Sequence, residues 1–166
     1  ITKIMTTLLA CENLNVKTKI TVSENASTSV SAGDSSIYAA PGEVFTRDQA
    51  LMAVMLQSAN EMSVAVAEEV SGSVKKFTEL MNWRAKLFGC KNTHFNNPNG
   101  LPDETHYTTA SDMAKIAKSA WLNPLFRRYC TRRYYEIPAT NKFAEARQIL
   151  NHHKMMKNGE YYYEGV

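Results

Sequence analysis

The stretch Leu51-Met-Ala-Val-Met-Leu-Gln-Ser-Ala-Asn60 contains an apolar run followed at once by a short polar break. Thr46 and Gln49 have the spacing of a capping box, so we expect a helix to begin just after Thr46 and to bury this apolar run. A second helix is expected over residues 61–70, and Gly72 is the type of residue that ends one. The serine and asparagine of the break would then both project from a helix junction into a cleft.

Helical and strand patterns continue on both sides of this junction. Further helices are expected over residues 1–13 and 74–88, after Thr109, and from Asn123-Pro124 onward. Short strands are expected at residues 19–22, 36–38, 133–137 and 160–163, and residues 23–34 are expected to form a loop. A helical middle flanked by strands predicts an α+β fold.

The length and composition indicate one globular domain over residues 1–166. Hydrophobic residues make up 44% of the chain and charged residues 21%, which argues against disorder. The longest apolar run, residues 50–56, is far shorter than the roughly 20 residues of a membrane-spanning helix. The net charge is only +3 and no dense Lys/Arg run is present, so we expect no nucleic-acid partner.

The cysteines and histidines give little support for a disulfide framework or a metal site. Cys11, Cys90 and Cys130 are odd in number and widely spaced, which favours buried free thiols; one disulfide with one free thiol is the alternative. His152 and His153 are adjacent, and no Cys-x-x-Cys pair occurs. We therefore expect no metal ligands.

A single lysine stands out in the first helix. Lys3 lies in the first turn of a helix that is otherwise apolar. Burial disfavours the charged ammonium, which lowers the pKa of a lysine and makes it a usable base. The alternative is a surface lysine whose ammonium reaches solvent, together with a Ser/Asn pair that only caps a helix.

Two other segments contain similar patterns by chance. In Ser73-Val-Lys-Lys76 the serine follows a glycine and opens an amphipathic helix, so we interpret it as an N-cap. Ser23-Glu-Asn25 lies in a polar stretch beside a strand, and we assign it no chemistry.

Four stretches, in order along the chain, carry a resemblance. They are Ile1-Thr-Lys-Ile-Met-Thr-Thr-Leu-Leu-Ala10, Ser58-Ala-Asn60, Lys91-Asn-Thr-His-Phe-Asn-Asn-Pro-Asn-Gly-Leu101 and His106-Tyr-Thr-Thr-Ala-Ser-Asp-Met113. Together they resemble the serine-type D-alanyl-D-alanine carboxypeptidases, the low-molecular-mass penicillin-binding proteins. The resemblance implies a β-lactamase/transpeptidase-like α+β fold, with a helical subdomain and parts of an antiparallel sheet.

The sequence departs from the family pattern at both ends. The nucleophilic serine would stand immediately before Ile1, and the Lys-Thr-Gly motif would follow shortly after Val166. We therefore expect an internal piece of a longer enzyme, truncated at both ends. The first and last strands of the sheet would lie outside it, and it would be inactive alone.

The resemblance also implies roles for three residues. Lys3 would take the proton of the missing serine, and Ser58 would relay it to the departing D-alanine nitrogen. Asn60 would hold the substrate amide and orient Lys3, so Ser58 and Asn60 are also the expected substrate-binding residues. No metal or cofactor is needed. The implied partners are peptidoglycan stem peptides and β-lactam antibiotics, outside the cytoplasm at the cell envelope or secreted, with any membrane association through other segments.

Two other functions compete with this one. A class A β-lactamase usually has Ser-Asp-Asn as its second motif, whereas Ala59 is the middle residue here. Such an enzyme also needs a glutamate that activates the deacylating water, and Glu104 cannot be assigned to that position from the sequence. The other alternative is a non-catalytic wall-binding domain on the same fold.

Overall fold

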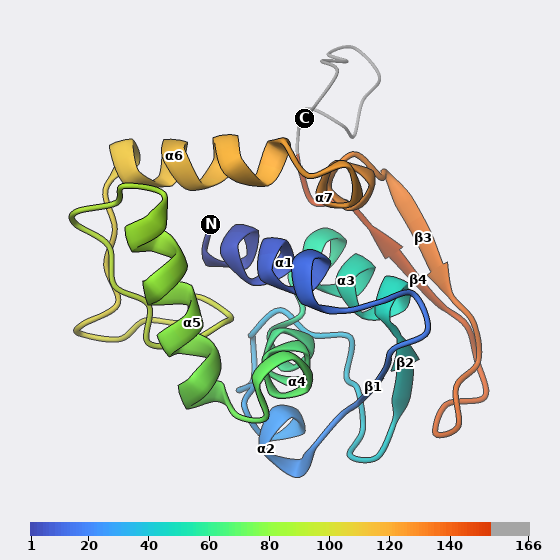
Figure 1. The fold of residues 1–166 in the computed structure, drawn as a ribbon. Helices are drawn as coiled ribbons and strands as arrows, with labels where there is room; N and C mark the ends of the chain where they lie inside the picture. The colour runs from blue at the N-terminus through green and yellow to red at the C-terminus, as the bar shows by residue number, and fades with distance from the viewer. Residues whose placement is uncertain (154–166) are drawn as a thin grey trace.

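Seven helices and four short strands make up residues 1–153, the part of the chain that the computed structural model describes (Figure 1). The helices are α1 (Thr2–Asn13), α2 (Glu24–Ser27), α3 (Arg47–Leu56), α4 (Asn60–Ser71), α5 (Val74–Leu87), α6 (Ala110–Trp121) and α7 (Pro124–Cys130). The strands are β1 (Lys19–Thr21), β2 (Val44–Thr46), β3 (Tyr134–Ile137) and β4 (Arg147–Leu150). This mixture confirms the α+β class.

Helix α1 runs through the middle of the molecule, between α6 and α7 on one side and α4 on the other (Figure 1). Met5, Leu8, Leu9 and Ala10 are each at most 1% exposed, and they contribute to three separate apolar clusters. Burial of one such large side chain contributes about 1.5–3 kcal/mol. The first turn of α1 is therefore held firmly, and it carries Lys3.

The expected helix boundaries agree with the structure because local caps set them. The Thr46 hydroxyl accepts a hydrogen bond from the Gln49 N–H at 3.2 Å, and the Gln49 side chain accepts one from the Thr46 N–H at 2.7 Å. Ser73 caps α5 by accepting from the Lys76 N–H, which confirms that its Ser-x-x-Lys pattern is structural. Gly72 ends α4 with φ of 76°. Each side-chain cap contributes about 1 kcal/mol.

Two expectations for the segment before α3 are wrong. Residues 36–38 form no strand, because the N–H groups of Ile37 and Ala39 bond to the Glu61 carboxylate and Tyr38 has φ of 55°. Residues 23–34 are not all loop, since Ser23 caps the short helix α2. The side chains of Ser23 and Asn25 both donate to Glu68, so this Ser-x-Asn pattern is a structural contact.

The strands form two antiparallel pairs. In the first, Ile20 of β1 faces Phe45 of β2, and in the second, Tyr135 of β3 faces Ile149 of β4. Strands β2 and β4 were not predicted, and the expected strand at residues 160–163 lies outside the described residues. The three cysteines are free, as favoured from their spacing, but each is only partly buried. No helix within residues 1–153 combines the length and the apolarity that a membrane crossing requires.

Candidate active site

The Lys3 ammonium joins three segments that are far apart in sequence. Its Nζ donates to Oδ1 of Asn60 at 2.7 Å and to the backbone carbonyl of Asn99 at 2.6 Å. Lys3 lies in the first turn of α1, Asn60 begins α4, and Asn99 belongs to the loop between α5 and α6. Two of the three residues singled out in the sequence, Lys3 and Asn60, are therefore in direct contact.

The surroundings of Lys3 suit a base that works near neutral pH. Burial lowers the pKa of Lys3 from its usual value near 10.5 to about 8, although the carboxylates of Glu61 and Asp34 oppose the change. Both acceptors of the ammonium are neutral groups, which stabilise the charged form less than a carboxylate in contact would. With this pKa, about a tenth of Lys3 is an uncharged amine at pH 7 and about half at pH 8.

Ser58 lies at the tight junction between α3 and α4. Its φ of 58° is unusual for a residue with a side chain and costs on the order of 1–3 kcal/mol. The strained turn allows the Ala59 N–H to bond to the Ala53 carbonyl, while the Asn60 N–H bonds to the Ser35 carbonyl at 2.9 Å. The half-buried Ser58 hydroxyl makes no hydrogen bond to any residue in 1–153, so the structure does not link it to Lys3.

The oxygen and the nitrogen of the Asn60 side-chain amide have different surroundings. The oxygen accepts from Lys3, whereas the amide nitrogen has no partner within the described part of the chain. Asn60 is only 4% exposed. A nearly buried amide with its oxygen engaged retains two N–H donors for a ligand carbonyl.

The loop between α5 and α6 is fastened to the first turns of α1. The Thr6 hydroxyl donates to the Pro98 carbonyl at 2.7 Å, and Thr2 Oγ1 lies 2.9 Å from Nε2 of His106. Nδ1 of His106 accepts from the Asn96 N–H at 3.2 Å, so Nε2 carries the hydrogen and donates to Thr2. These contacts fix the height of the loop above Lys3.

Gly100 allows this close approach. It has φ of 84°, and a Cβ there would lie 3.0 Å from Cβ and Oγ1 of Thr2. Any larger residue would push the loop away from α1 and move the Asn99 carbonyl from Lys3. The family resemblance singled out two stretches of this loop, residues 91–101 and 106–113, but nothing in the sequence assigned a role to the Asn99 carbonyl, Thr2 or His106.

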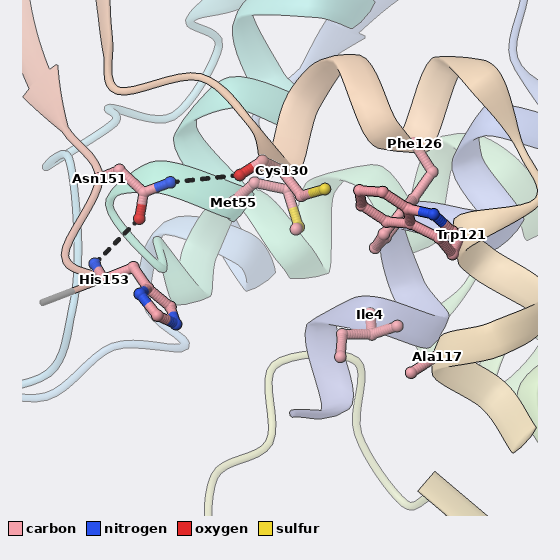
Figure 2. A pocket seen from close by; sticks show the side chains of 8 residues that line it. All are labelled: Ile4, Met55, Ala117, Trp121, Phe126, Cys130, Asn151 and His153. Atoms are coloured by element: carbon pink, nitrogen blue, oxygen red, sulfur yellow. Dashed lines mark hydrogen bonds between the residues drawn. The ribbon is translucent and has the colours of Figure 1, made fainter. Parts of the chain in front are cut away.

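An apolar cavity of about 420 Å³ lies on an adjoining side of α1 (Figure 2). It is lined by Ile4, Met55, Ala117, Trp121, Phe126, Cys130, Asn151 and His153. The lining has no carboxylate, lysine or hydroxyl group, and the Asn151 amide is occupied by the Cys130 carbonyl and the His153 N–H. The cluster around Lys3, which contains an amine with a lowered pKa, is therefore the stronger candidate for acid–base chemistry. Within residues 1–153 no three His, Cys, Asp or Glu side chains gather as metal ligands.

Comparisons with known proteins identify relatives of this chain. A model of the D-alanyl-D-alanine carboxypeptidase family matches residues 1–166. The D-alanyl-D-alanine carboxypeptidase DacF of Bacillus subtilis (strain 168) is 48% identical over 120 residues, which are 70% of this chain and 31% of DacF. The D-alanyl-D-alanine carboxypeptidase of Streptomyces sp. (strain K15) is 34% identical over 157 residues, 89% of this chain and 54% of that protein.

Solved structures agree with this assignment. The crystal structure of the Streptomyces K15 DD-transpeptidase superposes with a TM-score of 0.86 and 29% identity, over 94% of this chain and 64% of that one. This confirms the transpeptidase-like fold expected from the resemblance. The chain spans about a third to about half of the length of the two relatives above. The family match over residues 1–166, supported by the fold, shows that the chain belongs to the D-alanyl-D-alanine carboxypeptidase family.

Proposed function

We propose that these residues form the base-bearing part of the active site of a serine acyl-transfer hydrolase. Its substrate would be a peptidoglycan stem peptide, from which it removes the terminal D-alanine. The observation that carries the proposal is the Lys3 ammonium, partly buried, bonded to Asn60 and to the Asn99 carbonyl, with its pKa lowered to about 8. The names of the relatives support this substrate class.

The first half of the reaction forms a tetrahedral intermediate. A serine immediately before Ile1 would lie three residues before Lys3, on the same face of α1. Its hydroxyl attacks the carbonyl carbon between the two D-alanines while neutral Lys3 accepts the hydroxyl proton. Backbone N–H groups stabilise the resulting oxyanion.

The second half releases both products. The carbon–nitrogen bond breaks as Ser58 relays the proton held by Lys3 to the departing D-alanine nitrogen, which leaves the acyl-enzyme with Lys3 neutral again. The Asn60 N–H groups bind the substrate amide while the Asn60 oxygen keeps Lys3 in place. Water then hydrolyses the serine ester. The unengaged Ser58 hydroxyl and Asn60 nitrogen of the described structure support these assignments.

The same chemistry explains how β-lactams would bind. A strained lactam amide acylates the serine, and the ester is hydrolysed slowly. Peptidoglycan lies outside the cytoplasm, so we assign the enzyme to the cell envelope or to the secreted fraction. A class A β-lactamase would release the drug quickly, and a wall-binding domain would form no ester at all.

Mass spectrometry tests the proposal on the full-length gene product. We expect benzylpenicillin to add its mass to the parent protein, and Lys3→Ala to slow the addition by about 10²–10⁴-fold while remaining folded. A long-lived adduct supports the carboxypeptidase, and rapid turnover of the drug supports the β-lactamase. A folded parent that neither forms an adduct nor hydrolyses the drug, or a Lys3→Ala variant that reacts at the parent rate, overturns the proposal.

A further inference from the structure

Glu61 is a buried carboxylate that the proposed mechanism does not use. It follows Asn60 in the first turn of α4 and is 1% exposed. Its Oε2 atom is buried and has no hydrogen-bond partner within residues 1–153. A buried carboxylate normally fills both oxygens with donors or pairs with a cation. Within the described residues, this oxygen is therefore left without a donor or a cation.

The other oxygen of Glu61 organises the segment before β2. Oε1 accepts from the Ser36 hydroxyl at 2.7 Å, the Ile37 N–H at 2.7 Å and the Ala39 N–H at 3.4 Å. The Tyr38 N–H donates to the Ser36 hydroxyl at 2.7 Å. Residues 36–39 thus wrap around one carboxylate, in the manner of a backbone anion nest.

This wrapping accounts for the strained backbone at Tyr38. A residue with φ of 55° costs on the order of 1–3 kcal/mol, and here it lies between two residues, Ile37 and Ala39, whose N–H groups both donate to Glu61. The Tyr38 side chain is left 82% exposed. Because the Asn60 N–H also bonds to the Ser35 carbonyl, the segment is fastened to both of the first two residues of α4.

Glu61 is also part of the charged surroundings of Lys3. The ionisable side chains around this lysine are Glu61 in α4, Asp34 before the wrapped segment, and His106 through its contact with Thr2. The Glu61 and Asp34 carboxylates favour the ammonium form. Of the two, Glu61 is the buried one, and it adjoins the residue that bonds to Lys3.

We propose that Glu61 is a positioning residue of this site, which anchors residues 36–39 beside Asn60 and whose charge tunes Lys3 through space. The inference rests on the proposed function, because it assigns Glu61 an effect on the base of that reaction. Its two parts are separable: the hydrogen bonds of the carboxylate hold the segment, and its negative charge partly offsets the effect of burial on Lys3.

Three substitutions separate these parts. Glu61→Gln keeps an oxygen for the Ile37 N–H but removes the charge. Ser36→Ala removes one donor of the wrapped segment and leaves the charge. Glu69→Gln removes the same formal charge from an exposed position further along α4, so it serves as the matched control.

The measurement is the rate of acylation by a fluorescent penicillin between pH 6 and 10, on full-length protein. Removal of a nearby negative charge disfavours the ammonium, so Glu61→Gln should move the midpoint of the pH profile down by about 0.5 unit. Ser36→Ala should keep the parent midpoint and lower the plateau rate several-fold. Glu69→Gln should match the parent in both.

The outcomes distinguish this inference from the proposed function. A folded Glu61→Gln protein with the parent midpoint overturns the inference, while acylation of the parent that depends on Lys3 leaves the proposed function intact. If Glu61→Gln does not fold, Glu61→Asp replaces it: the parent midpoint with a reduced plateau supports the positioning role, and parent rates throughout overturn it. A parent that is never acylated overturns the proposed function and this inference with it.

Discussion

The buried carboxylate of Glu43 and the partly buried ammonium of Lys3 have opposite kinds of hydrogen-bond partner. Glu43, at 0% exposure, accepts two hydrogen bonds from the Arg147 guanidinium, at 2.7 and 3.1 Å, and further ones from Thr140 and the Ala40 N–H. Burial alone would raise the pKa of Glu43, but these donors hold it below its usual value. The carboxylate is saturated by an opposite charge, which is typical of a structural contact.

The Lys3 ammonium, in contrast, has no oppositely charged hydrogen-bond partner within residues 1–153. Its hydrogen-bond acceptors are an amide oxygen and a backbone carbonyl, and the buried carboxylate of Glu61 makes no ion pair with it. Burial therefore lowers the pKa of Lys3 to about 8. The contrast indicates that charge partners stabilise the fold at Glu43, whereas neutral partners keep Lys3 poised to exchange a proton.

The largest effect is expected when the ion pair between Glu43 and Arg147 is broken. Arg147→Ala leaves Glu43 buried without its cation, so we expect the free energy of unfolding to fall by about 3–5 kcal/mol at pH 7. Without the guanidinium, burial raises the pKa of Glu43. The free-energy cost of burying the ionised carboxylate is then present at neutral pH, and it decreases as the carboxylate becomes protonated at lower pH. Denaturant unfolding at pH 7 and pH 5 measures both effects. A loss below 1 kcal/mol at pH 7 would contradict a structural role for the pair.

A smaller effect is expected when Lys3 is given a charged partner, as Glu43 has. Asn60→Asp places a carboxylate on the ammonium, which raises the pKa of Lys3 by about 1 unit or more. Acylation at pH 7 should then fall at least tenfold, and the midpoint of its pH profile should move to higher pH. Stopped-flow acylation of the full-length variant measures this, with its thermal unfolding as the folding control. An unchanged midpoint would count against Lys3 as the base.

The smallest effect tests the loop that supplies the carbonyl. Gly100→Ala forces a Cβ against Thr2 and strains a left-handed φ, so we expect about 1–2 kcal/mol of destabilisation and a several-fold slower acylation. Gly89→Ala is the matched control, because Gly89 has φ of 75° with open space around it. It should lose similar stability with no change in rate. Equal losses of acylation rate in both variants would contradict the proposal that this loop positions a carbonyl on Lys3.

The parts of this molecule that sequence predicts best are those set by local contacts. Caps at Thr46 and Ser73 defined their helices, and the lone lysine of an apolar helix indicated the site together with Asn60. The missed parts depend on contacts between distant segments. The Asn99 carbonyl reaches Lys3 across the sequence, and Ile37 leaves strand geometry because its N–H bonds to Glu61.

The strand predictions failed for a related reason. Strand β4 has few β-branched residues and is defined by its pairing with β3, so its own sequence pattern gave no signal. Ser58 was predicted from the family motif, but its left-handed backbone follows from the junction that Ala53 and Ser35 close. Tertiary hydrogen bonds, which no local pattern encodes, therefore set the details of the site.

A direct titration of Lys3 tests whether its surroundings prepare it to act as a base. In full-length protein with isotope-labelled lysine side chains, the Lys3 signal is the one absent from the spectrum of Lys3→Ala. We predict that this signal titrates with a midpoint near pH 8, well below that of the exposed lysines. A midpoint near 10.5, the usual lysine value, would show that the neutral acceptors and burial do not prepare Lys3 as a base.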